Sequence, residues 1–186
     1  MVIAADPHIF NHLYGEKLDI LKIFIKSMWK KKNNVYSHEL ATVAMSEDGL
    51  LGMELGYPGK DKAKLFQQGM EELVELFGRN FLKTMAQKQK EGLSYFSPYV
   101  PKDAYYLLFI SVLETGRNKG IGTRLLLNVF DKARKAGFKS VHLDVFWGNP
   151  AKNLYERMGM RCMVETILPG YQKPLGIHYR MVKDLS

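Results

Sequence analysis

Residues 117–124, Arg-Asn-Lys-Gly-Ile-Gly-Thr-Arg, join an apolar stretch of sequence to an amphipathic one. The stretch before them, residues 105–113, is aromatic and β-branched and predicts a mostly buried strand. After them, apolar residues recur at the spacing of a helix. These residues are Leu125, Leu126, Val129, Phe130 and Ala133. The order predicts a strand, a glycine-containing turn and a helix.

This turn has the features of an anion site. Gly120 and Gly122 have no side chains, so the backbone can approach a ligand closely. The N–H groups in the first turn of the following helix point out of its positive end, which favours a bound anion. Arg117, Lys119 and Arg124 add positive charge. We therefore expect a phosphate or pyrophosphate ligand.

Three interpretations of the glycine pair compete. The first is a turn whose small residues serve packing alone. The second is a dinucleotide fingerprint, G-x-G-x-x-G, with an acid about 20 residues later for the ribose. Asp144 would supply that acid, but Leu125 takes the third glycine position and would obstruct close packing of helix and strand. A phosphate-loop motif is excluded because no Gly-Lys-Ser/Thr follows at the required spacing.

The third interpretation is a family resemblance. Residues 117–122 are similar to the coenzyme A (CoA) pyrophosphate loop of the GCN5-related N-acetyltransferases (GNAT superfamily), Arg/Gln-x-x-Gly-x-Gly/Ala, and fill every specified position. A second strand is predicted at residues 140–146. Residues 148–160 then resemble the family's later motif, Asn-x-x-Ala-x-x-Leu-Tyr-Glu-x-x-Gly-Phe, and residues 179–185 resemble its closing strand. The resemblance covers residues 105–186.

The resemblance implies an α/β (α+β) fold. Its central sheet is mixed, mainly antiparallel, splayed in the middle and flanked by helices. We expect residues 1–186 to form a single acetyltransferase domain. Residues 40–45 and 50–57 predict the second and third strands of the family, joined by a turn at residues 46–49.

Further elements precede and interrupt this plan. A short strand at residues 2–5 and helices at residues 7–14 and 16–31 are expected before the sheet. A helical insertion at about residues 58–104 separates the third and fourth strands, with a break at Gly78. We expect this insertion to pack beside the acceptor cleft or to form a dimer contact.

The implied activity is direct transfer of an acetyl group from acetyl-CoA, the cosubstrate, to a primary amine. The resemblance assigns the pantetheine arm to the backbone of Val112 and Leu113. The side chain of Asn149 would also contact the arm, with Asn153 as the alternative. The pyrophosphate falls to the loop, whose residues are Arg117, Asn118, Lys119, Gly120, Ile121, Gly122 and Thr123.

Proton transfer has one implied donor and several candidate acceptors. Tyr155 stands where the family places the tyrosine that protonates the leaving sulfur, and a phenol with a pKa near 10 is protonated at neutral pH. The alternative for Tyr155 is a core aromatic beside Leu154. Glu114, at the mouth of the loop, is the candidate general base, and Glu54 and His142 are further candidates.

Composition narrows the class of protein. A chain of 186 residues suits one domain with a sizeable core. Charged residues make up 25% and hydrophobic residues 46%, which excludes extended disorder. The net charge of +8 suits a polyanionic cofactor, and we expect no nucleic-acid partner because no recognition motif accompanies the charge. We also expect no membrane span and no metal site.

The single cysteine, Cys162, excludes an intramolecular disulfide and favours a reducing compartment. We expect it to be a small buried hydrophobe on a strand. The amino terminus has no basic leader with an apolar run, so the expected location is cytoplasmic.

Three function classes result. The favoured one is an N-acetyltransferase that acts on a small-molecule or protein amine, as a monomer or homodimer. The second is a non-catalytic acyl-CoA-binding sensor or interaction domain, which predicts binding without turnover. The third is an NAD(P)-binding oxidoreductase, against which Leu125 argues.

Overall fold

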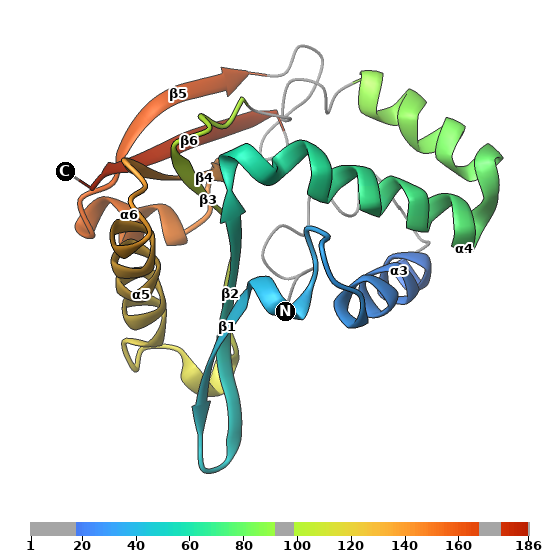
Figure 1. The fold of residues 1–186 in the computed structure, drawn as a ribbon. Helices are drawn as coiled ribbons and strands as arrows, with labels where there is room; N and C mark the ends of the chain where they lie inside the picture. The colour runs from blue at the N-terminus through green and yellow to red at the C-terminus, as the bar shows by residue number, and fades with distance from the viewer. Residues whose placement is uncertain (1–17, 92–98, 168–175, 186) are drawn as a thin grey trace.

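The computed structural model of the protein describes residues 18–91, 99–167 and 176–185. A six-stranded sheet forms its centre (Figure 1). The strands are β1 (Ala41–Ser46), β2 (Gly49–Pro58), β3 (Ala104–Val112), β4 (Ser140–Phe146), β5 (Arg161–Ile167) and β6 (Ile177–Asp184). They lie in the order β1-β2-β3-β4-β6-β5, and all neighbours are antiparallel except β3 and β4. The predicted mixed, mainly antiparallel sheet is confirmed.

Helices cover both faces of the sheet, with α3 and α4 on one side and α5 and α6 on the other (Figure 1). Their bounds are α3 (Leu18–Lys30), α4 (Lys62–Glu91), α5 (Ile121–Lys135) and α6 (Ala151–Arg157). Short 3-10 turns are η1 (His38–Leu40), η2 (Gly59–Asp61) and η4 (Glu114–Gly116). The strand predicted at residues 2–5, the helix at 7–14 and the start of the helix at 16–31 lie outside the described residues. None of the described helices combines the length and apolarity needed to cross a membrane.

The α5 face of the sheet holds the larger core. All five apolar residues predicted for the stripe of α5 are buried. Leu126, Val129, Phe130 and Ala133 belong to one cluster with residues of β3, β4 and β6. Gly52 of β2 permits this approach, because a Cβ there would lie 3.1 Å from Leu125 Cδ1 and 3.2 Å from Ile121 Cγ2. The helix that follows the glycine loop is thus fixed directly on the sheet.

The opposite face is covered by α3 and α4. Their apolar side chains form a second cluster with residues of β2 and β3: Leu21, Phe24, Met28, Met53, Leu55, Leu73 and Phe109. α4 is interrupted at Gly78, whose φ of 79° and ψ of 167° are not helical. A glycine adopts a positive φ without a steric penalty, and the predicted break at this residue is confirmed. The roles expected for this segment, at the acceptor cleft or in a dimer, stay predictions.

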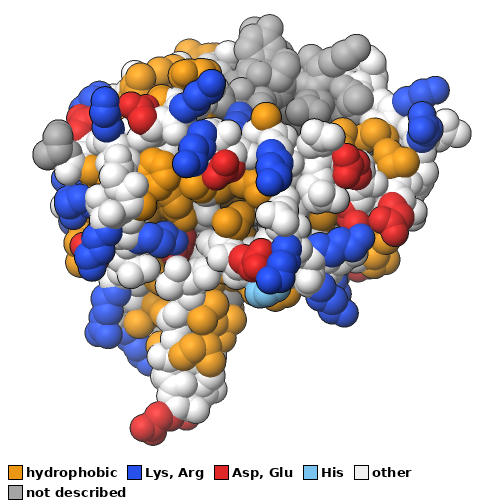
Figure 2. All heavy atoms as spheres, in the orientation of Figure 1, with side chains coloured by type: hydrophobic (Ala, Val, Ile, Leu, Met, Phe, Trp, Pro, Cys, Tyr) orange, Lys and Arg blue, Asp and Glu red, His pale blue; other side chains and the backbone are white. Residues whose placement is uncertain are grey.

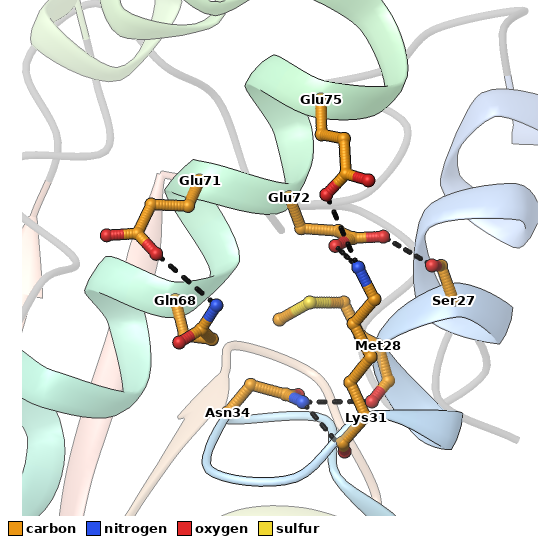
Figure 3. A network of polar contacts seen from close by, with 8 residues as sticks. All are labelled: Ser27, Met28, Lys31, Asn34, Gln68, Glu71, Glu72 and Glu75. Carbon is orange, nitrogen blue, oxygen red and sulfur yellow. Dashed lines mark hydrogen bonds and ion pairs between the residues drawn. The ribbon is translucent and has the colours of Figure 1, made fainter.

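A buried carboxylate fastens α4 to α3 (Figure 3). Glu72 is 2% exposed and accepts hydrogen bonds from Ser27 Oγ and Lys31 Nζ. Burial raises the pKa of Glu72, but the bonds from Lys31 and Ser27 outweigh burial and hold it below the ordinary 4.5. Asn34 Nδ2 donates to the carbonyl oxygens of Met28 and Lys31 and closes the turn after α3. This network fixes the helical layer over the sheet.

The two edges of the sheet are exposed. The β1–β2 hairpin projects from the body and carries hydrophobic side chains on its surface (Figure 2). Val43, Met45 and Leu50 of this hairpin are exposed. At the other edge, β5 pairs on one side only, with β6, and its side chains are mostly exposed. Cys162 lies on this strand and is exposed, so the prediction that it is buried was wrong. As an edge strand with mostly exposed side chains, β5 leaves this small residue at the surface.

Candidate active site

β3 and β4 separate soon after they meet. Their backbones pair at three positions, which are Ala104–Ser140, Tyr105–Val141 and Tyr106–His142. Beyond these, β3 continues along β2 to Val112, and β4 continues along β6 to Phe146. The sheet is therefore splayed between residues 107–112 and residues 143–146. We call this gap the β3–β4 opening. Among the described strands, β4 no longer pairs with β3 along residues 107–112.

A β-bulge bends β3 beside this opening. Gly56 of β2 pairs with Leu107 and Leu55 pairs with Phe109, so Leu108 is an extra residue on β3. A bulge disrupts the ladder locally and re-aims the residues that follow it. The bend occurs two residues after Tyr106, at the point where β3 and β4 part.

The glycine loop follows the end of β3. Asn118 and Gly120 have left-handed backbones, with φ of 58° and 72°, and Gly120 caps α5. The first i to i−4 hydrogen bond of α5 runs from Arg124 N to Gly120 O. The N–H groups of the three preceding residues therefore point out of the helix start, as an anion site requires. These residues are Ile121, Gly122 and Thr123.

The basic residues of the loop are at the surface. Arg117 and Lys119 are exposed beside the start of α5. Ile121 is instead buried and anchors the helix start to the sheet. Leu113, next to the loop, donates its N–H to Leu51 O at 2.8 Å, so its backbone still follows β2, and its side chain is exposed. The loop thus combines a fixed backbone with solvent-exposed cations.

Three predicted elements meet at Gly122. A Cβ at this residue would lie 3.2 Å from Leu154 Cδ2 on α6 and 3.7 Å from Val112 Cγ2 at the end of β3. The end of the splayed strand, the first turn of α5 and the helix that carries Tyr155 are therefore in contact around one residue without a side chain. The sequence motifs of residues 117–122 and 148–160 come together here in space.

The asparagine predicted to contact pantetheine has a local role. Asn149 is half-buried, and its Oδ1 accepts a hydrogen bond from Ala151 N at 2.9 Å, at the start of α6. That bond orients the amide and leaves its NH₂ group as the donor. Asn153, the alternative, is exposed on α6.

Tyr155 is buried in the α5-face core, with 5% of its surface exposed. Burial raises the pKa of its phenol, so the group is neutral throughout the physiological range. A neutral phenol can donate a proton or a hydrogen bond. The same burial also fits a purely structural aromatic, which was the alternative interpretation.

The candidate bases lie in three different environments. Glu114 is exposed in the turn η4, just before the loop. Glu54 is fully buried on the α5 face, where its Oε1 accepts from Lys132 Nζ at 2.8 Å. His142 Nε2 lies 3.0 Å from Ser140 Oγ, and burial, followed by the charge of Arg180, lowers its pKa.

A polar network that sequence reasoning missed crosses the β3–β4 opening. Tyr106 Oη donates to Asp144 Oδ2 at 2.6 Å. Arg180 binds both oxygens of the same carboxylate, from Nε at 2.6 Å and from Nη2 at 2.9 Å. The sequence offered one signal, which is an acidic residue, Asp144, in the apolar strand 140–146 and a basic residue, Arg180, in the apolar strand 179–185. Opposite charges in two buried strands indicate a pair.

Comparison with known proteins agrees with this geometry. Residues 85–160 match the model of the acetyltransferase (GNAT) family, and this region contains β3, the glycine loop, β4 and α6. This region of the chain is thus similar to acetyltransferases of the GNAT family. No curated protein matches its sequence significantly.

Solved acetyltransferase structures share the fold of this chain. The N-acetyltransferase from Staphylococcus aureus Mu50 has a TM-score of 0.70 at 17% identity, over 98% of this chain and 90% of that chain. Another acetyltransferase has a TM-score of 0.61 at 21% identity, over 96% and 86%. A Bacillus subtilis acetyltransferase in complex with CoA has a TM-score of 0.56 at 16% identity, over 100% and 90%. At such identities the likeness establishes the fold alone.

Proposed function

We propose that the protein transfers an acetyl group from acetyl-CoA directly to a primary amine of a small molecule or protein. The observation that carries this proposal is the meeting of Val112, Gly122 and Leu154 beside the opening. Residues 107–112, where β3 has parted from β4, offer backbone groups to the pantetheine arm, and the start of α5 offers N–H groups and cations to the pyrophosphate. One extended ligand that carries a pyrophosphate next to a pantetheine arm would fill both the β3–β4 opening and the anion site at the start of α5.

The reaction needs few groups from the protein. The amine nitrogen attacks the thioester carbonyl carbon, the C–S bond breaks, and the CoA thiolate leaves with the electron pair. Tyr155 is proposed to give the proton to that thiolate, because its raised pKa keeps it protonated. Glu114 is proposed to take the proton of the ammonium, directly or through water. Glu54 is not proposed as the base, because its carboxylate is already paired with Lys132 on the α5 face.

A non-catalytic acyl-CoA-binding domain is the second candidate. The burial of Tyr155 among apolar side chains and the exposure of Glu114 favour it, because neither residue is then required to move protons. The oxidoreductase alternative has less support, because the sheet is mainly antiparallel and Leu125 is packed where a dinucleotide site needs glycine.

The test is calorimetric titration with acetyl-CoA and with NADP, on the natural protein and on Gly120→Val. We expect acetyl-CoA binding that Gly120→Val abolishes. Gly137→Val is the matched control, because Gly137 also has a positive φ, of 79°, and open space around it, but lies after the other end of α5. Absence of acetyl-CoA binding to the natural protein would overturn the proposal.

Turnover separates the two candidates. Thiol release from acetyl-CoA is followed with a panel of amines, for the natural protein and Tyr155→Phe. A catalytic acid predicts that Tyr155→Phe lowers turnover by roughly 100-fold or more while the affinity for acetyl-CoA is kept. Equal turnover would reduce Tyr155 to packing, and binding without turnover on any amine would favour the non-catalytic domain.

A further inference from the structure

The side chains of Tyr106, Asp144 and Arg180 form a bridge at the mouth of the β3–β4 opening. Tyr106 belongs to the last backbone pair of the two strands, and Asp144 lies two residues beyond that pair on β4. The hydrogen bond of 2.6 Å between them therefore joins the strands at the first position where their backbones no longer do.

The bridge is rigid on the β4 side. Arg180 is the register partner of Asp144 on β6 and holds both carboxylate oxygens. Such bidentate pairs are strong and fix geometry. The guanidinium also lies over the Tyr106 ring, 5.4 Å from its centroid, and Nη1 donates to Tyr99 O at 2.9 Å. Asp144 is thus held in place independently of Tyr106.

In the bridge, Tyr106 acts only as a hydrogen-bond donor. Its side chain is 7% exposed, and burial, followed by the charge of Asp144, raises its pKa well above the ordinary value of 10.0. The phenol is neutral at physiological pH, and its O–H donates the hydrogen bond that the Asp144 carboxylate accepts. Leu108, the bulge residue, and the segment of residues 107–112 that has parted from β4 come directly after Tyr106.

We propose that the Tyr106–Asp144–Arg180 bridge is a positioning element, which sets the width of the β3–β4 opening for the pantetheine arm of CoA. This inference rests on the proposed function, since it takes CoA as the ligand. The bridge holds β3 just before the edge that would pair with the arm, so the binding groups are aligned before the ligand arrives. The nucleotide part of CoA is held by the start of α5 and does not depend on the bridge.

The test compares two ligands on two variants, Tyr106→Phe and Asp144→Asn. CoA and adenosine 3′,5′-bisphosphate, its nucleotide part without the arm, are titrated calorimetrically. We expect CoA to bind roughly tenfold more weakly to either variant, because a bond to a charged group is lost or weakened. The affinity for the bisphosphate stays unchanged. In turnover, KM for acetyl-CoA rises more than kcat falls.

Tyr57→Phe is the matched control. Its ring is fully buried and lies 5.4 Å from that of Tyr106, so the change removes a hydroxyl from the same layer without breaking the bond to Asp144. It should leave both affinities unchanged. Three results would each overturn the role of the bridge but not the proposed function. They are an equal loss of affinity for CoA and the bisphosphate in Tyr106→Phe, an effect of Tyr57→Phe as large as that of Tyr106→Phe, and unchanged CoA binding by Tyr106→Phe. A natural protein that does not bind CoA would overturn the proposed function and the bridge with it.

Discussion

Glu72 and Asp144 are two carboxylates with similar partners and different surroundings, Glu72 buried and Asp144 half-buried. Each accepts a hydroxyl bond and a cation: Glu72 from Ser27 and Lys31, Asp144 from Tyr106 and Arg180. Glu72 joins two helices whose apolar faces already pack together. Asp144 joins two strands whose backbones have separated.

The comparison shows that the role of a carboxylate–cation pair depends on the packing and backbone pairing around it. Around Glu72, apolar packing would hold α3 and α4 together without the pair, so the pair adds stability. Around Asp144, side chains replace a missing backbone ladder, so the pair also shapes a gap. The two cations also differ in exposure, since the side chain of Lys31 is 43% exposed and that of Arg180 only 7%.

Removal of the buried cation should have the largest effect on folding. Arg180→Met leaves Asp144 without its cation, and breaking a buried pair in this way costs about 3–5 kcal/mol. Urea denaturation of both proteins measures the loss in free energy of unfolding. Arg161→Met is the control, because the Arg161–Asp184 pair, at 3.2 Å, is exposed on both sides and should contribute little. Similar losses for the two variants would remove the distinction between buried and exposed pairs here.

Removal of the helix-joining carboxylate should have a smaller effect on folding and none on binding. Glu72→Ala deletes charge-assisted bonds to Ser27 and Lys31, and we expect a loss of about 1.5–3 kcal/mol in the free energy of unfolding. The affinity for CoA should be unchanged, unlike that of Asp144→Asn. Glu75→Ala tests the same lysine from an exposed position, 3.4 Å away, and should change stability little. Weaker CoA binding by Glu72→Ala would contradict the contrast between the two regions.

The smallest effect concerns His142, which lies beside Tyr106 in the last backbone pair. Its pKa in the folded protein is below the ordinary 6.5, chiefly because of burial, so the unfolded chain binds its proton first as the pH falls. Stability from this residue is therefore fully present above pH 6.5 and decreases below it, down to the folded pKa. Thermal unfolding of the natural protein and His142→Gln between pH 7.5 and about 5 should diverge on the acid side. Parallel curves would mean that His142 does not titrate differently in the fold.

Local patterns predicted much of the fold. The strand at residues 140–146 coincides with β4, and the break at Gly78 lies where the helical pattern is interrupted. The stripe of α5 was readable because a helix buried on one side repeats its apolar residues at a fixed spacing. Each of these features depends on neighbours within a few residues.

Features that depend on distant residues were not predictable. The Tyr106–Asp144 bond joins positions 38 residues apart, and no local pattern specifies it. The exposure of Cys162 depends on β5 being an edge strand, which its own sequence does not reveal. For Tyr155, the motif and the burial agree with both a catalytic and a structural role, so only measurement separates them.

The position of Cys162 has a practical consequence for spectroscopy. It is the single cysteine of the chain and is exposed on β5, the neighbour of the strand that carries Arg180. A thiol-reactive fluorophore would therefore attach at one site of the natural protein, without any engineered residue. Its emission would follow changes at the outer edge of the sheet as ligands are titrated.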